Sequence, residues 1–329
     1  MKKPFYLIIS SFILCALSIF AYYQVYHSKS NENVSYAMLS SAMIDAISII
    51  GGKTKLWDSE VQTVTTHKFP TGADTVKALS SRQVDFATLA GWPFILATER
   101  DSSLRVVATI TKAYSLGILA NKEKGINELK DLQGKKIGVS FGTTGQFVLE
   151  TYLNQAGIEN SQYERVALKP QEMLSAYDRG DIDAISTWQP FLQLAENNKP
   201  NSSILVPGSQ MFFKVNFLLV SYEDYLEKNP EKTKKLLSGL LQVSQWIKSN
   251  KVDAMRIYME SSGMKASDVD QLWPLFEFEV SLDRSLLNAL ESQESWGLVS
   301  GSIKNKKNWR QYIFSSGLEQ IAPERVNMH

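Results

Sequence analysis

The sequence contains two similar blocks, VDFATLAGWPF from Val84 to Phe94 and IDAISTWQPF from Ile182 to Phe191, which begin about 98 residues apart. Each block combines an apolar stretch of strand length with a turn that carries tryptophan and proline, and an apolar helix start follows. A further strand-like stretch and a short helical segment precede each block. The order strand, helix, strand predicts βα units and a largely parallel sheet. Because the spacing is too long for a solenoid repeat, the two blocks indicate two α/β lobes of related topology.

The chain length supports this division. A chain of 329 residues can form two lobes of ordinary size, each large enough to bury its own core. We expect the first part of lobe I at residues 34–112 and lobe II at residues 113–208. Residues 209–329 are expected to return to lobe I and to add the C-terminal helices.

The N-terminal segment is typical of a leader. Lys2 and Lys3 precede an uncharged run from Phe5 to Tyr23, which as a helix spans roughly 28 Å and so matches a hydrocarbon core. Residues 1–23 are therefore predicted to be a signal anchor or signal peptide, and residues 24–33 a polar tether. The positive end stays in the cytoplasm, which places the rest of the chain outside, in the periplasm or at the extracellular face of the membrane.

Two features bear on how this leader is processed. Ile19, two places before a possible cleavage after Ala21, is not the small residue that a signal peptidase prefers, and this favours an uncleaved anchor. Cys15 is the single cysteine and could carry a lipid. Leu14 before it, and the apolar residues after it, favour instead a small apolar residue inside a membrane helix.

Composition excludes some classes of function. The 35 basic and 34 acidic residues nearly balance, so the chain lacks the positive charge of a nucleic-acid-binding protein. No HExxH or CxxC spacing for zinc is present, and neither a metal nor a cofactor is expected.

One stretch matches the nucleophile-elbow pattern of serine hydrolases. Gly138 to Gly142 reads G-x-S-x-G, with Ser140 at the nucleophile position. A triad in that order needs a histidine downstream, and His329, the final residue, is the single one that follows. The chain is therefore not expected to be an enzyme.

Candidate ligand-binding residues follow the predicted strands, at the points where strands open into helices. The carboxyl ends of parallel strands are where α/β proteins bind ligands, and helix starts offer free amides and a partial positive charge. The candidates are Ser40 and Ser41, Gly91 and Trp92, Thr143, Thr144 and Gly145, and Trp188.

The two tryptophans occupy matched positions in the repeated blocks. Each could pack under its own turn, but the match favours Trp92 and Trp188 on opposite walls of a cleft between the lobes. Thr143 and Gln146 have the spacing of a capping box, in which the threonine accepts a first-turn amide and the glutamine reaches back. Capping by Thr143 is compatible with ligand contact by Thr144.

The segment GKKIGVSFGTTGQFVLETYLNQAGI, with YDRGDIDAISTWQPF after it and VKALSSRQVDFATLAGWPF before it, resembles the substrate-binding proteins of ABC importers for nitrate, sulfonate, taurine and thiamine precursors. The resemblance covers about residues 34–299. It implies a two-lobed periplasmic-binding-protein fold of type II that closes over a small solute. It also implies that the candidate residues above contact the ligand.

The expected function is that of a membrane-tethered, extracytoplasmic and monomeric protein that delivers a small solute to an ABC permease. Hydroxyls and helix starts favour a small oxyanion such as a sulfonate or nitrate. A planar or cationic ligand between Trp92 and Trp188, such as a thiamine pyrimidine precursor, remains open, because indole faces also bind cations. A membrane-anchored sensor or accessory subunit that uses the same fold is the alternative from another class.

Overall fold

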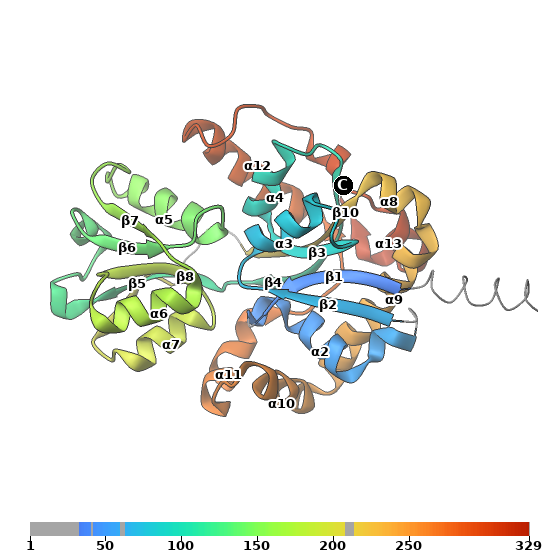
Figure 1. The fold of residues 1–329 in the computed structure, drawn as a ribbon, viewed down its shortest axis with the longest axis horizontal. Coiled ribbons are helices and arrows are strands. Elements are labelled where there is room, and N and C mark those ends of the chain that lie inside the picture. Colours follow the sequence, from blue (N-terminus) through green and yellow to red (C-terminus); the bar gives the residue numbers. More distant parts are fainter. Residues whose placement is uncertain (1–32, 41, 60–62, 208–213, 329) are drawn as a thin grey trace, which may run out of the picture.

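The computed structural model describes residues 33–40, 42–59, 63–207 and 214–328. The predicted leader at 1–23 and nearly all of the tether lie outside the described residues. Within those ranges, no helix combines the length and the apolar character that crossing a membrane would require. The chain forms two α/β lobes, each built around one sheet (Figure 1).

Sheet A has six strands in the order β11-β4-β10-β3-β1-β2. Strand β1 pairs in parallel with β2 and β3, whereas β10 runs antiparallel to β3 and β4, and β11 antiparallel to β4. The strands are β1 (Asn33–Leu39), β2 (Thr63–Phe69), β3 (Phe86–Ala90), β4 (Leu104–Ala113), β10 (Val215–Tyr222) and β11 (Phe276–Glu277).

Sheet B has five strands in the order β7-β6-β8-β5-β9. Strand β6 pairs in parallel with β7 and β8, and β5 runs antiparallel to β8 and β9. The strands are β5 (Leu116–Asn121), β6 (Lys136–Val139), β7 (Glu164–Ala167), β8 (Ala184–Trp188) and β9 (Ser202–Val206).

The two sheets repeat one arrangement. Strands β2, β1 and β3 of sheet A correspond to β7, β6 and β8 of sheet B, and in each sheet an antiparallel strand follows the third parallel one. The repeated blocks supply the equivalent strands β3 and β8. The expectation of a largely parallel sheet is confirmed in part, because β5 and β10, which follow the crossings between the lobes, run antiparallel to both of their neighbours and make both sheets mixed.

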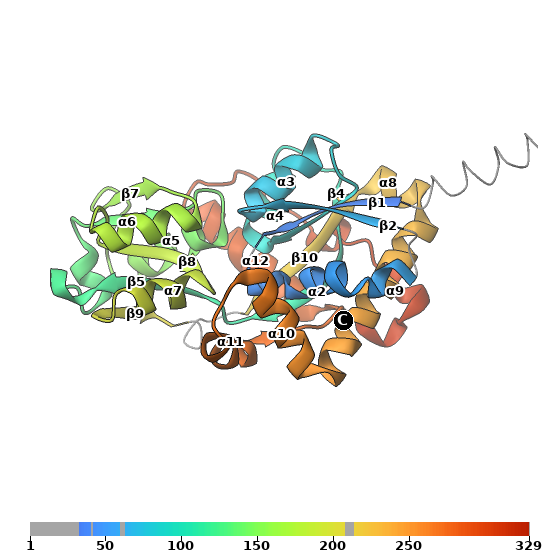
Figure 2. The ribbon, with the colours of Figure 1, turned by 60° about the horizontal axis from the view of Figure 1, so that its bottom comes forward.

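Helices cover both sheets. In the lobe of sheet A, α3 and α4 lie on one face and α2 and α9 on the other (Figure 2). This lobe contains α2 (Ala46–Thr54), α3 (Gly72–Ser80), α4 (Gly91–Thr98), α8 (Glu223–Lys228), α9 (Pro230–Ser249), α10 (Lys251–Ser262), α11 (Ala266–Leu272), α12 (Arg284–Val299), α13 (Ser316–Ile321) and the small parallel pair β12 (Leu282–Asp283) and β13 (Val326–Asn327). The lobe of sheet B contains α5 (Thr144–Gln155), α6 (Pro170–Arg179) and α7 (Phe191–Asn198).

Helix α9 shows how tightly the lobe of sheet A is packed. Proline occupies its first position, and its buried stripe of leucines faces the core. Gly239 in this stripe lies against Trp57, which is fully buried. A Cβ atom added at Gly239 would lie 2.7 Å from the Cβ and 2.9 Å from the Cα of Trp57. The glycine is therefore required by the close approach of the two backbones.

We expect Gly239→Ala to destabilise the protein by about 1–3 kcal/mol, because the added methyl group overpacks this contact. The effect opposes the gain of about 1 kcal/mol that alanine brings in a helix interior. Urea unfolding of the full chain measures it. Ser238→Ala, one position earlier and only partly buried, is the matched control and should be neutral or slightly stabilising. A Gly239→Ala protein as stable as the control would contradict the packing argument.

Candidate functional site

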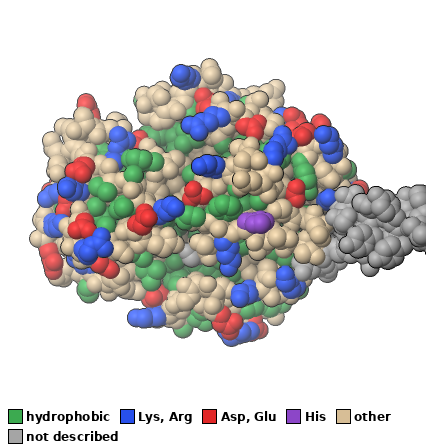
Figure 3. Space-filling view, in the orientation of Figure 1, with side chains coloured by type: hydrophobic (Ala, Val, Ile, Leu, Met, Phe, Trp, Pro, Cys, Tyr) green, Lys and Arg blue, Asp and Glu red, His purple; other side chains and the backbone are tan. Residues whose placement is uncertain are grey.

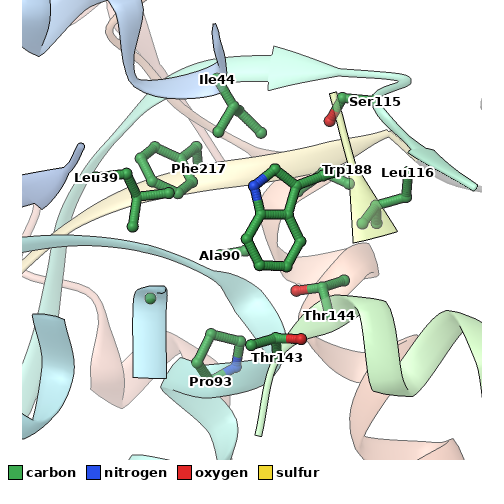
Figure 4. A pocket seen from close by; sticks show the side chains of 12 residues that line it. Leu39, Ile44, Ala90, Pro93, Ser115, Leu116, Thr143, Thr144, Trp188 and Phe217 are labelled. Carbon is green, nitrogen blue, oxygen red and sulfur yellow. The ribbon is translucent and has the colours of Figure 1, made fainter. Parts of the chain in front are cut away.

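A pocket lies between the two sheets, at the carboxyl ends of β1, β3 and β8 and at the first turn of α5 (Figure 4). The pocket is small, with a volume of about 40 Å³. The lining residues come from both lobes and from the strands at the crossings between them: Leu39, Ile44, Gly72, Ala90, Pro93, Ser115, Leu116, Thr143, Thr144, Trp188, Val215 and Phe217.

The lining is apolar and uncharged. Among the twelve lining residues that the structure describes, none is Lys, Arg, His, Asp or Glu, and the polar groups are the hydroxyls of Ser115, Thr143 and Thr144 and the indole N–H of Trp188. The outer surface differs, because basic and acidic side chains are interspersed over its visible face (Figure 3). The described lining therefore offers a charged solute dipoles and hydroxyl groups.

Helix α5 begins at this pocket and brings two threonines to it. Thr143 is the N-terminal cap by backbone geometry, but its hydroxyl donates to the carbonyl of Ser140 at 2.7 Å and accepts no first-turn amide. Gln146 reaches back to accept the amide of Gly142 at 2.8 Å. The predicted capping box is therefore wrong in its detail, because the threonine hydroxyl turns to the preceding loop. Thr144 is 4% exposed, and its buried Oγ1 has no hydrogen-bond partner.

Trp188 ends strand β8 and lies across the pocket, with Leu39 and Phe217 on one side and Leu116 on the other (Figure 4). The indole is 8% exposed and meets the ring of Phe191 edge to face at 6.2 Å between centroids. Its Nε1 is buried and has no hydrogen-bond partner. The side chain thus offers an apolar wall and one free donor.

Trp92 is placed differently from its prediction. It is the second residue of α4, is 1% exposed, and is absent from the pocket lining. Its ring packs on Phe147 of α5 and Trp296 of α12. The expectation that Trp92 faces Trp188 across the cleft is therefore wrong, and Ala90 and Pro93 take its place in the lining.

The remaining predicted residues lie around the pocket rather than in its lining. Ser40 follows β1 and its amide donates to the carbonyl of Phe69 at 2.9 Å, while Ser41 lies outside the described residues. Gly91 opens α4 beside the side chain of Gln293. The carbonyl of Gly145 in α5 accepts from the hydroxyl of Ser186 at 2.8 Å. Of the predicted residues, Thr143, Thr144 and Trp188 are the ones brought together in the lining.

A buried carboxyl group lies directly behind the pocket wall. Asp45 is fully buried in the short 3-10 helix Met43–Asp45, and its Oδ2 accepts the amide of Leu39 at 2.8 Å and the hydroxyl of Thr88 at 2.6 Å. It thereby ties the end of β1 to β3. Burial raises the pKa of Asp45 to about 7, although both hydrogen bonds favour its ionised form.

Several lining residues were not predicted from the sequence. Pro93 and Ala90 stand inside the repeated block, so a consistent comparison of the two blocks could have included them. Ser115 lies between β4 and β5, Leu116 begins β5, and Val215 and Phe217 lie at the start of β10. They line the site because β5 and β10 both begin beside it, and sequence patterns gave no sign of this placement.

Ser140 holds the nucleophile position of the elbow pattern, and its hydroxyl is engaged by the backbone. The hydroxyl of Ser140 donates to the carbonyl of Leu168 at 2.6 Å. In the described part of the chain, no group of three or more His, Cys, Asp or Glu side chains is arranged to hold a metal ion.

Comparison with known proteins gives three findings. The family described as NMT1/THI5 like matches residues 64–271, more than half of the chain. A putative binding protein of Brucella abortus (strain 2308) is 23% identical over 284 residues, which cover 82% of this chain and 86% of the relative. The taurine-binding periplasmic protein of Escherichia coli (strain K12) is 30% identical over 183 residues, which cover 56% of this chain and 57% of the relative.

The fold has solved counterparts. The alkanesulfonate-binding protein SsuA from Xanthomonas axonopodis pv. citri bound to MOPS is similar with a TM-score of 0.77 and 15% identity, covering 86% of this chain and 98% of that one. The two-lobed periplasmic-binding-protein fold predicted from the sequence is thereby confirmed. These relatives are named as binding proteins, in agreement with the expectation that the chain is not an enzyme.

Proposed function

The chain belongs to the NMT1/THI5-like family, and on this premise we propose that it is an extracytoplasmic solute-binding protein for a small anion with a hydrocarbon body, such as an alkanesulfonate. It would deliver this solute to the permease of an ABC transporter. Residues 5–23 would anchor the protein at the membrane. If the leader is cleaved, the protein would be released. Relatives named as taurine-binding and alkanesulfonate-binding proteins support the solute class.

The observation that carries the proposal is an uncharged pocket between the lobes with two buried donors that have no partner. Thr144 Oγ1 and Trp188 Nε1 both line it and lack hydrogen bonds. A buried polar group without a partner costs about 1–3 kcal/mol, and in a pocket a ligand can supply the missing partner. Both groups can donate, and the ligand group that they favour is an acceptor such as a sulfonate oxygen.

The rest of the pocket fits the body of such a solute. The start of α5 adds a partial positive charge, worth about 0.3–1 kcal/mol to an anion. Leu39, Leu116 and Phe217 provide apolar surface against which a hydrocarbon chain can pack. Nitrate has no hydrocarbon part that would use this surface. A cationic solute is disfavoured as well, because no carboxylate is among the described residues that line the pocket.

A thermal-shift screen of the full chain in detergent micelles tests the proposal. The informative pair is ethanesulfonate and taurine, which share the sulfonate and differ by the ammonium group of taurine. We expect ethanesulfonate to stabilise the protein more, because the ammonium group finds no acidic partner in the lining. A ligand at a hundredfold excess over its Kd adds about 2.7 kcal/mol to the free energy of unfolding.

Nitrate and a pyrimidine complete the screen, because neither combines an anionic group with a hydrocarbon body. Stronger stabilisation by taurine than by ethanesulfonate would show that the site favours the ammonium group, and would overturn the uncharged hydrocarbon body while leaving the sulfonate and the binding function intact. Absence of any shift across sulfonates, nitrate and pyrimidines would contradict the solute-binding function itself.

A further inference from the structure

A larger hollow adjoins the solute pocket along α3 and α4. Its volume is about 640 Å³. Pro93 lines both cavities, and two further residues of the larger one, Ala73 and Gly142, are the chain neighbours of the pocket residues Gly72 and Thr143. The two cavities therefore lie next to each other, and the larger one is called the vestibule below.

Helices α3 and α4 form most of the vestibule and lead away from the pocket. They lie side by side in the lobe of sheet A (Figures 1 and 2). Helix α3 begins at the pocket residue Gly72, and Lys77 lies roughly 8 Å further along its axis. Arg100 directly follows the C-terminal cap of α4, the helix that carries Pro93. Because all of these residues belong to one lobe, their arrangement is independent of how the two lobes are oriented.

Two cations line the vestibule without an ion-pair partner. Lys77 and Arg100 are both exposed members of its lining. Within the described ranges of the chain, neither side chain forms a salt bridge or a hydrogen bond. Their charges are therefore free to act on a solute.

The nearby carboxylates offset only part of this positive charge. Glu99 and Asp101 belong to the same lining. Glu99 pairs with Lys307 at 2.8 Å, so its charge is already offset. Asp74, one turn before Lys77 on α3, lies outside the vestibule lining, and its Oδ2 accepts the hydroxyl of Thr71 at 2.7 Å. Two cations thus face one carboxylate, Asp101, and the charge of the vestibule is net positive.

The vestibule and the pocket differ in the range over which they can attract an anion. The described pocket lining contains no lysine or arginine, and its donors act only at hydrogen-bond distance. A full charge acts further, since the screening length is about 10 Å at an ionic strength of 0.1 M. The vestibule can therefore concentrate an anion beside the pocket before any hydrogen bond to the solute forms.

We propose that Lys77 and Arg100 draw an anionic solute electrostatically towards the uncharged pocket, and so set the rate and the charge selectivity of its capture. This inference rests on the proposed function, because it takes the solute to be an anion. Neither side chain lines the pocket, so the pair acts on the encounter rather than on the bound solute. Charges at the rim of a site typically change the association rate and its salt dependence, and leave the dissociation rate nearly constant.

Stopped-flow fluorescence on the full chain in non-ionic detergent micelles, with ethanesulfonate as the solute, tests the proposal. The indole of Trp188 in the pocket provides the signal. At an ionic strength of about 10 mM, the association rate constant of Lys77→Gln/Arg100→Gln is expected to be about three- to tenfold below that of the original protein. At about 0.5 M the two rates should converge, because salt screens the attraction. The dissociation rate constants should agree throughout.

Lys248→Gln/Lys251→Gln is the matched control. It removes the same two charges from exposed positions of the same lobe, at the junction of α9 and α10. Helix α9 lies on the face of sheet A opposite α3 and α4 (Figure 2). The control should associate like the original protein. Lys77→Arg/Arg100→Lys keeps both charges and changes both shapes, so it should also keep the original rate.

The possible failures are distinguishable. The vestibule is overturned, and the proposed function stands, if Lys77→Gln/Arg100→Gln associates as fast as the original protein, if salt does not slow the original protein, or if the matched control is slowed equally. A Lys77→Arg/Arg100→Lys protein as slow as the glutamine variant would overturn the electrostatic cause. If the original protein does not bind ethanesulfonate, in this assay or by calorimetry, the proposed solute fails and the inference fails with it.

Discussion

Replacing Asp45 with asparagine is expected to abolish a loss of stability that the protein otherwise shows as the pH rises from about 4 to 7. In the unfolded chain this carboxyl group ionises near its ordinary pKa of 3.8, whereas in the folded protein burial raises the pKa to about 7. Between these values the folded state binds one proton more than the unfolded state. Each unit of rising pH therefore favours unfolding by about 1.4 kcal/mol.

The total effect is on the order of 4 kcal/mol at pH 7 and above, and it vanishes below the unfolded pKa. Asparagine cannot ionise, yet its side-chain oxygen can accept both hydrogen bonds. This is because the amide of Leu39 and the hydroxyl of Thr88 both donate to the same oxygen of Asp45, Oδ2. The free energy of unfolding, measured by urea titration between pH 4 and 8, should show the fall in the original protein and not in Asp45→Asn. Carboxyl groups elsewhere contribute to both proteins and cancel in the difference.

A second substitution separates this cause from general damage. Thr88→Val removes a hydroxyl that stabilises the ionised form of Asp45, so it should raise the pKa of Asp45 in the folded protein further. The fall in the free energy of unfolding should then continue to a higher pH. Equal pH dependence in the original protein and in Asp45→Asn would show that the carboxyl titrates normally in the fold. The result also matters for binding, because an ionised Asp45 behind Leu39 and Ile44 would repel an anion in the pocket.

The repeated blocks predicted the two lobes and the equivalence of β3 and β8 correctly, because alternation of apolar residues and turn chemistry are local signals. They failed for Trp92 because the blocks differ in length by one residue. Aligned from Val84 and Ile182, the residue that matches Trp188 is Ala90, and both of these end their strands and line the pocket. Trp92 falls two positions later, inside a helix, where the side chain points elsewhere.

Other parts of the site depend on contacts that no local pattern carries. Asp45 stands in an apolar stretch that reads as a helix start, and its burial follows from the pairing of β1 with β3. Phe217 enters the pocket only because β10 returns from the other lobe to lie between β3 and β4. Long-range pairing of this kind decides which side chains meet, whereas propensity and periodicity decide only the elements that carry them.

Trp188→Ala is expected to weaken binding of the preferred sulfonate by roughly 30- to 1000-fold, or about 2–4 kcal/mol, as is typical for a buried tryptophan at the centre of a binding site. The indole provides both a wall of the pocket and a buried donor without a partner. Isothermal titration calorimetry with the sulfonate that gives the largest thermal shift measures the change. The shift itself should also disappear at ligand concentrations that saturate the original protein.

Trp188→Phe divides this loss into its two causes. Phenylalanine keeps an aromatic wall beside Phe191 but lacks the N–H group, so the expected loss is smaller, about tenfold, for one hydrogen bond to a charged ligand. Trp57→Phe is the matched control, because Trp57 is another buried indole whose Nε1 has no partner, and it packs against Tyr36 away from the pocket lining. It should lower the melting temperature and leave the Kd unchanged. If both Trp188 variants bind the sulfonate like the original protein and only melt earlier, Trp188 is a packing residue and the solute lies elsewhere.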